Sequence, residues 1–137
     1  MKNLSQSLFT KFTGSAFSTS IGGRLYKARA PQNPTWPYAV YYLISDVPRD
    51  TFSEKLEEVL IQFSVFSQAS GSTEIEDAAT NLKALYDNST MTVTGNTCVQ
   101  MERVGGGSLT DIPADTTLGT GQYYQYDVDY EVVMQKN

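Results

Sequence analysis

Residues 36–44 have the sequence Trp36-Pro37-Tyr38-Ala39-Val40-Tyr41-Tyr42-Leu43-Ile44. Most of these side chains are aromatic or β-branched, a composition that favours a β-strand. Pro37 stands at the start of the run, where a missing backbone donor does least harm to a sheet. The sequence therefore predicts a strand over 38–45 with half-buried or fully buried side chains.

A second strand is predicted shortly after the first. Its residues fall into two alternating sets, Val59, Ile61, Phe63 and Val65 against Leu60, Gln62, Ser64 and Phe66. This period of two is typical of a strand. Residues 46–53 contain Pro48 and Asp50 and predict a turn. We therefore expect strands 38–45 and 56–67 to pair as a long antiparallel hairpin.

Two helices are predicted. Leu4, Leu8 and Phe12 recur every four residues and indicate a short amphipathic helix that ends at Gly14. The second helix covers 73–86, with Ser72 or Thr73 as its cap and acidic residues in its first turn, which the helix dipole favours. Its apolar face consists of Ile75, Ala78, Ala79, Leu82 and Leu85 or Tyr86.

The remaining segments predict three more strands and two loops. Residues 14–23 are rich in Gly, Ser and Thr and predict a loop, anchored by Phe17 and Ile21. Strands are expected over 24–28, 91–104 and 124–132, the last with the most regular alternation in the chain. A long polar hairpin loop is expected at about 105–120.

The order helix, strand, strand, strand, helix, strand, strand predicts an α+β fold. Strands that follow each other as hairpins favour a mainly antiparallel sheet, and we expect the two helices to pack on one of its faces. A length of 137 residues fits one domain over 1–137.

Charge is divided unevenly along the chain. The net charge is −5, which argues against general nucleic-acid binding. Residues 1–45 carry five basic side chains and no acid, whereas residues 46–137 carry five basic and fifteen acidic side chains. Arg24, Lys27 and Arg29 are therefore candidates for contacts with acids of a neighbouring subunit, because such a split orients association. The alternative is that the charges are scattered over a solvated surface.

Three carboxylates, Asp127, Asp129 and Glu131, project from one face of the last predicted strand. A solvated polar face is the simplest interpretation. An acidic surface that faces another subunit or a channel is the second, and a metal site is a lesser alternative because strand spacing separates the carboxylates by about 7 Å.

The run Gly105-Gly106-Gly107-Ser108 does not open a predicted helix, so it does not fit a phosphate-binding loop. We interpret it as part of a hairpin tip. Gly106, Leu109 and Ile112 in this segment are candidates for contact with a partner.

The residue inventory argues against catalysis. The chain has no histidine, which removes the commonest general base and metal ligand, and its single cysteine, Cys98, can form neither an intrachain disulfide nor a zinc site. We expect no enzymatic activity, no metal and no cofactor. Nine tyrosines suit sheet packing or a subunit interface. We also expect neither a signal peptide nor a membrane span.

The chain resembles the tail-completion proteins of siphophages, also called tail terminator or tail-to-head joining proteins. The resemblance lies in a short N-terminal helix, the segment Ala28-Arg29-Ala30-Pro31, and a strand like Pro37–Ile44. A second strand like Val59–Ser67 and a helix like Ile75–Tyr86 with the pair Ala84-Leu85 complete it. The resemblance covers about residues 4–134, and it concerns strand composition and order.

The resemblance implies a virion structural protein that forms a ring, which in this family is hexameric. Such rings cap the tail tube and join it to the head-tail connector protein, in a virion assembled in the host cytoplasm. The expected partners are other copies of the chain, the tail tube protein and the connector, with DNA only passing through the lumen without specific binding. Alternatives are another neck or minor capsid component, or a tyrosine-rich module that binds a small ligand or carbohydrate.

Overall fold

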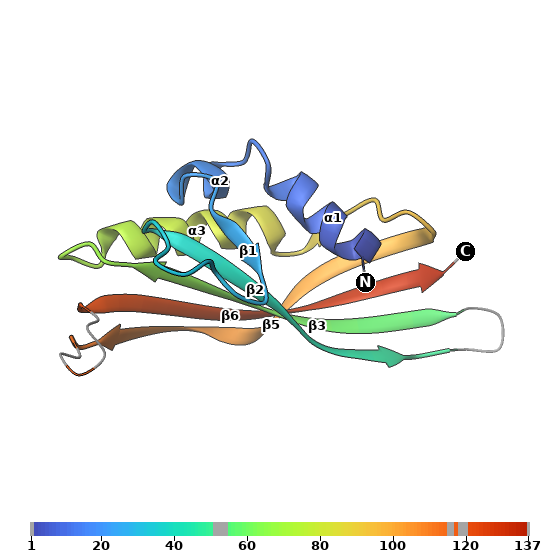
Figure 1. The fold of residues 1–137 in the computed structure, drawn as a ribbon. Helices are drawn as coiled ribbons and strands as arrows, with labels where there is room; N and C mark the ends of the chain where they lie inside the picture. The colour runs from blue at the N-terminus through green and yellow to red at the C-terminus, as the bar shows by residue number, and fades with distance from the viewer. Residues whose placement is uncertain (1, 51–54, 115–116, 118–120, 137) are drawn as a thin grey trace.

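The computed structural model of the protein describes residues 2–50, 55–114, 117 and 121–136. Within these residues the elements in chain order are α1 (Lys2–Phe12), α2 (Ala16–Ser20), β1 (Leu25–Lys27), β2 (Tyr38–Pro48), β3 (Leu56–Ser67), α3 (Thr73–Tyr86), β4 (Ser89–Thr90), β5 (Asn96–Ile112) and β6 (Tyr123–Lys136). The strands form one twisted sheet, and the helices lie on one of its faces (Figure 1). The predicted α+β class is confirmed.

The strand order in the sheet is β1-β2-β3-β6-β5-β4. β2 and β3 form the predicted antiparallel hairpin, from Tyr38 opposite Phe66 to Pro48 opposite Glu57. β5 and β6 form a second hairpin, and β3 pairs with β6 in the middle of the sheet. β1 is parallel to β2 and the other pairs are antiparallel. The two hairpins point to opposite ends of the sheet (Figure 1).

The predicted turn over 46–53 is wrong in its first part, because β2 continues to Pro48. A β-bulge between Leu43 and Ser45 shifts the register, and the pairing with β3 then resumes. Pro48 is tolerated because it ends the strand at the sheet edge, where no ladder donor is required. Residues 51–53 of the predicted turn lie outside the described residues.

The hairpin loop predicted over 105–120 is wrong in its first part, which belongs to a strand. β5 starts at Asn96 rather than residue 91 and runs through Ile112, so the glycine run lies inside a strand. Register shifts flank Gly105, and Gly107 has a φ of +68°. A Cβ atom at residue 105 would come within 2.8 Å of the Asp129 carboxylate. The glycines thus permit bulges where β6 side chains press against the β5 backbone.

The predicted loop over 14–23 contains the short helix α2. Ser15 is its N-cap, and its Oγ atom accepts a hydrogen bond from the Ser18 N–H at 3.1 Å. Phe17 and Ile21 are fully buried, which confirms them as anchors. The Ser72 cap of α3 is also as predicted, although its side chain makes no capping hydrogen bond to the backbone.

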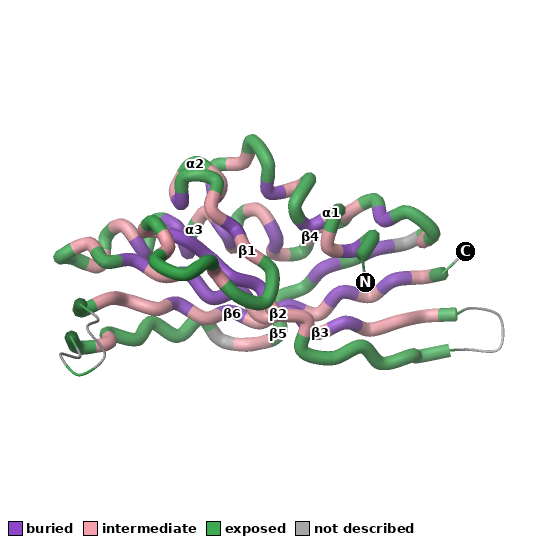
Figure 2. Tube along the Cα trace, viewed as in Figure 1, coloured by how far each residue is buried: buried purple, intermediate pink, exposed green. Residues whose placement is uncertain are grey.

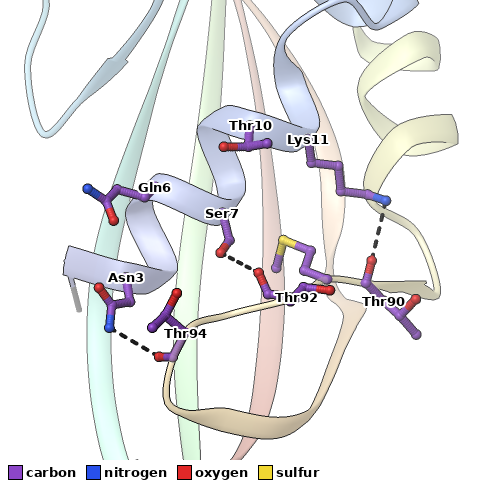
Figure 3. Close-up of a pocket in the computed structure, with 9 residues that line it drawn as sticks. Asn3, Gln6, Ser7, Thr10, Lys11, Thr90, Thr92 and Thr94 are labelled. Atoms are coloured by element: carbon purple, nitrogen blue, oxygen red, sulfur yellow. Dashed lines mark hydrogen bonds between the residues drawn. The ribbon is translucent and has the colours of Figure 1, made fainter.

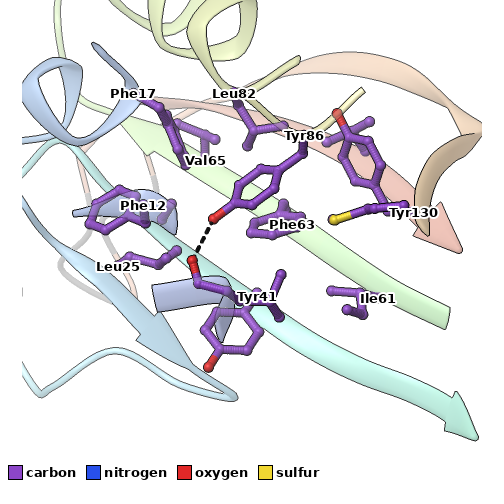
Figure 4. Packing of buried hydrophobic residues seen from close by; sticks show 14 of the residues in the cluster. Phe12, Phe17, Leu25, Tyr41, Ile61, Phe63, Val65, Leu82, Tyr86 and Tyr130 are labelled. Atoms are coloured by element: carbon purple, nitrogen blue, oxygen red, sulfur yellow. Dashed lines mark hydrogen bonds between the residues drawn. The ribbon is translucent and has the colours of Figure 1, made fainter. Parts of the chain in front are cut away.

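The core lies between the helices and the covered face of the sheet (Figure 2). Leu4, Leu8 and Phe12 of α1 are buried there, as the four-residue spacing predicts. Phe63 lies at the centre, and its ring stacks on Tyr86 at 4.9 Å and meets Tyr130 edge-on at 5.8 Å (Figure 4). The Tyr86 hydroxyl donates to the Leu8 carbonyl at 2.9 Å and so ties α3 to α1.

Candidate assembly surfaces

The sheet has two open edges. β1 is the last strand on one side, and three residues of β1 cover only Ala39–Tyr41 of β2. On the other side β4 pairs only with Gln100 and Met101, so in the described chain no strand covers β5 from Glu102 to Ile112. We call these surfaces the β1 edge (Leu25–Arg29) and the β5 edge (Glu102–Ile112). Unpaired backbone groups make such edges sites where another chain can add.

The basic residues predicted to meet a neighbour separate into two kinds. Arg24 is used within the chain, because its guanidinium donates to the carbonyl of Pro37 at 2.8 Å and to that of Trp36 at 3.2 Å. Lys27 and Arg29 are exposed at the β1 edge. The structure therefore leaves two of the three predicted cations available for a partner.

A groove runs beside the β1 edge on the helix-covered face. Its volume is about 700 Å³, and it lies between α1 and the start of the sheet. Phe9, which is 47% exposed, contributes the apolar part of the lining, while Lys2 and Lys27 contribute positive charge. The groove therefore offers an apolar surface with a basic rim, next to an open strand.

The β5 edge carries the candidates from the glycine segment. Val104 is 52% exposed and Leu109 is 42% exposed, so this edge presents two large apolar side chains to solvent. Ile112 is half-buried at the end of the strand, and Gly106 belongs to the bulged part of β5. Leu109 lies directly opposite the core residue Tyr126, so it points to the helix-covered face.

The acidic residues of β6 lie on the opposite, helix-free face. Asp127 accepts hydrogen bonds from the Ser64 hydroxyl at 2.6 Å and from the Gln125 amide at 3.0 Å. Asp129 lies against Gly105. Glu131 is directly opposite Glu102 of β5, an arrangement of like charges that is unfavourable in a sheet. No ion pair joins either glutamate to a cation in the part of the chain that the structure describes.

An aromatic cluster lies outside the main core and was not predicted as a group. The Tyr38 ring stacks on Phe66 at 4.9 Å and meets Trp36 edge-on at 5.0 Å. Tyr26 and Tyr123 complete the cluster. Burial raises the pKa of the Tyr38 hydroxyl, with smaller contributions from neighbouring tyrosines. The sequence could have indicated this cluster, because Tyr38 and Phe66 lie at the same end of the predicted hairpin, away from its turn.

The cavity beneath α1 lies where side chains of α1 form hydrogen bonds to segment 90–94 (Figure 3). Asn3, Ser7 and Lys11 donate hydrogen bonds to the carbonyls of Thr94, Thr92 and Thr90, at 3.1, 2.7 and 3.4 Å. Four residues of helix rise about 6 Å, close to two residues of extended chain, so every fourth side chain meets every second carbonyl. The polar lining therefore holds segment 90–94 against α1.

Over residues 2–50, 55–114, 117 and 121–136, no group of three or more carboxylates or cysteines is arranged to hold a metal ion. Within the same residues, no helix is long and apolar enough to cross a bilayer.

The sequence matches the protein family described as "Tail completion protein gp17" over residues 6–135. Among solved structures, a chain titled "Virion of native gene transfer agent (GTA) particle" has a similar fold, with a TM-score of 0.77 at 11% identity, covering 95% of this chain and 92% of that one. A second solved chain gives a TM-score of 0.55 at 16% identity, covering 96% and 91%. No curated protein sequence matches. The two structural likenesses concern the fold.

Proposed function

Since the chain belongs to the tail completion protein gp17 family and is a structural protein of the phage virion tail or neck, we propose that it forms a ring that caps the tail tube. In this proposal the same ring joins the tube to the head-tail connector. The role is structural and needs no catalytic group and no cofactor.

The observation that carries the proposal is the pair of open edges on opposite sides of one sheet. Two different edges that bind each other make a head-to-tail contact, and repeated head-to-tail contacts close into a ring when the rotation permits. We propose six copies, in line with the family resemblance. Self-association through one identical patch would instead stop at a dimer.

The two hairpins supply the contacts to the tube and the connector in this proposal. They leave the sheet at opposite ends, so in a ring whose axis follows the strands they project from opposite faces (Figure 1). The β2–β3 hairpin exposes Ile44 and Val47 near its tip. The pair Ile112 and Tyr123 lies at the other end, where the described part of the β5–β6 hairpin stops. One ring would thereby present two different docking faces.

We further propose that the acidic face of β6 lines the lumen. Asp127, Asp129 and Glu131 share the helix-free face with Glu102 and with Glu58 of β3. Negative charge disfavours adhesion of the DNA phosphates, so DNA would pass without specific binding.

Electron microscopy of tail tubes assembled without this protein tests the proposal. After the purified protein is added, we expect a closed ring at one end of the tubes and no further growth of those tubes. Tubes without the protein serve as the control. Tube ends that stay bare, or tubes that continue to grow, would show that the protein is not the terminator.

A further inference from the structure

We infer that neighbouring copies in the ring join the β5 edge of one subunit to the β1 edge and Phe9 groove of the next. The inference rests on the proposed ring and names its interface. The occupant of each edge is therefore a second copy of this chain.

The direction of the strands supports this contact. Three successive antiparallel pairings separate β2 from β5, so the two strands run in opposite directions. β1 is parallel to β2 and therefore also runs opposite to β5. Two copies placed side by side, with the same face outward, would bring β5 antiparallel to β1. This is the arrangement that the rest of the sheet already uses.

The open parts of the two edges also lie at the same position along the strand direction. Cross-strand pairings form a continuous row across the sheet through Leu25, Ala39, Val65, Tyr126 and Leu109. The next row runs from Tyr26 through Asp127 to Ser108. A neighbour placed without any shift along the strands would therefore face its β1 residues toward Ser108 and Leu109. A ring of this kind closes without an axial step between copies.

The apolar side chains fit the same arrangement. Leu109 points to the helix-covered face, and the Phe9 groove opens on that face beside β1. Both side chains are more than two-fifths exposed in the single subunit. Burying Leu109 against Phe9 of the next copy would remove both from water. The glycine bulges of β5 interrupt its ladder, which discourages indiscriminate strand addition and leaves the side chains to select the partner.

Charge completes the match. Lys2, Lys27 and Arg29 surround the β1 edge, where the chain has no acid before residue 46. Glu102 is exposed on the β5 edge, on the side of Leu109 toward which Lys27 and Arg29 of the neighbour would lie, and it is held opposite Glu131. A cation from the neighbour would relieve that like-charge pair. Complementary charge of this kind fixes register and suppresses wrong contacts.

A charge-exchange experiment tests the interface. One variant carries Lys27→Glu with Arg29→Glu, a second carries Glu102→Lys, and ring formation on tail tubes is measured for each. We expect each variant alone to assemble roughly tenfold less well or worse, because like charges then face each other. An equal mixture should recover assembly, because each altered edge meets a complementary one.

Apolar substitutions give a matched comparison. Leu109→Asp should abolish rings, whereas Ala84→Asp, at an exposed apolar residue of α3 that belongs to neither edge and to neither hairpin, should leave ring formation intact. Circular dichroism checks that every variant is folded.

The outcomes separate the two proposals. If the unaltered protein forms no ring, the proposed function fails, and the interface fails with it. If it forms rings and the charge variants alone assemble equally well, or the mixture is not restored, the ring stands and this interface is wrong.

Discussion

The helix-covered centre of the sheet and its β5 edge use similar side chains in opposite ways. At the centre, Phe63 is fully buried among aromatic rings. At the edge, Val104 and Leu109 also belong to a strand, but about half of each side chain is exposed to solvent. β4 covers only two residues of β5. The comparison indicates that the centre specifies the fold of one subunit, whereas the edge is left for contact with another.

The largest expected effect on stability comes from the centre. Phe63→Ala removes a fully buried ring that touches Tyr41, Tyr86 and Tyr130. We expect the free energy of unfolding to fall by about 3–5 kcal/mol, the range for a large core truncation that leaves a cavity. Chemical denaturation monitored by tryptophan fluorescence measures this value. A loss below about 1 kcal/mol would show that the centre does not dominate stability.

The tyrosines of the centre also predict a response to pH. Burial raises the pKa of Tyr86, and burial together with the hydrogen bond to Asp87 raises that of Tyr130. A raised folded pKa means that the stabilisation is fully present below the unfolded value of about 10 and is lost as the pH rises beyond it. The denaturant concentration at the unfolding midpoint should therefore decrease as the pH rises above about 10.

The double variant Tyr86→Phe with Tyr130→Phe should show a shallower fall with pH than the unaltered protein. Denaturation curves at several alkaline pH values test this. Identical slopes for the two proteins would assign the alkaline transition to other groups.

A smaller effect is expected where α1 holds segment 90–94. Ser7→Ala removes one hydrogen bond to the Thr92 carbonyl and should lower the unfolding free energy by about 0.5–1.5 kcal/mol. Gln6→Ala, an exposed neighbour on the same helix, is the matched control. Equal changes in unfolding free energy for the two substitutions would mean that they reflect helix propensity rather than the hydrogen bond between Ser7 and segment 90–94.

The smallest effect on subunit stability is expected at the edge. Leu109→Ser should change the unfolding free energy of the free subunit by no more than about 0.5 kcal/mol, as is usual for exposed positions. The same substitution should nevertheless reduce ring formation. A large loss of subunit stability would instead make Leu109 part of the core and weaken the distinction between the two regions.

Much of the centre could be predicted from the sequence, because its periodicity is local. The spacing of Leu4, Leu8 and Phe12 identified α1, and the alternation over 59–66 identified β3. The course of β5 could not be predicted, since a run of three glycines ordinarily ends a strand. The strand continues because Ser108–Ile112 pair with β6 again after the bulges, and the missing side chain at Gly105 leaves room for Asp129.

The candidate surface was predicted in part. Lys27, Arg29 and Leu109 lie on open edges, but the sequence does not reveal that the open parts of these edges lie at the same position along the strand direction. Arg24 was included with the other cations, although its guanidinium binds carbonyls twelve and thirteen residues away. Partners this distant in the chain leave no periodic signal.

The most direct test is a high-resolution reconstruction of capped tube ends by electron cryomicroscopy. We expect a closed ring in which Leu109 of each subunit lies within about 4.5 Å of the Phe9 groove of the next subunit. A ring in which Leu109 remains in solvent, or in which the β1 edge contacts only the tube, would contradict the account.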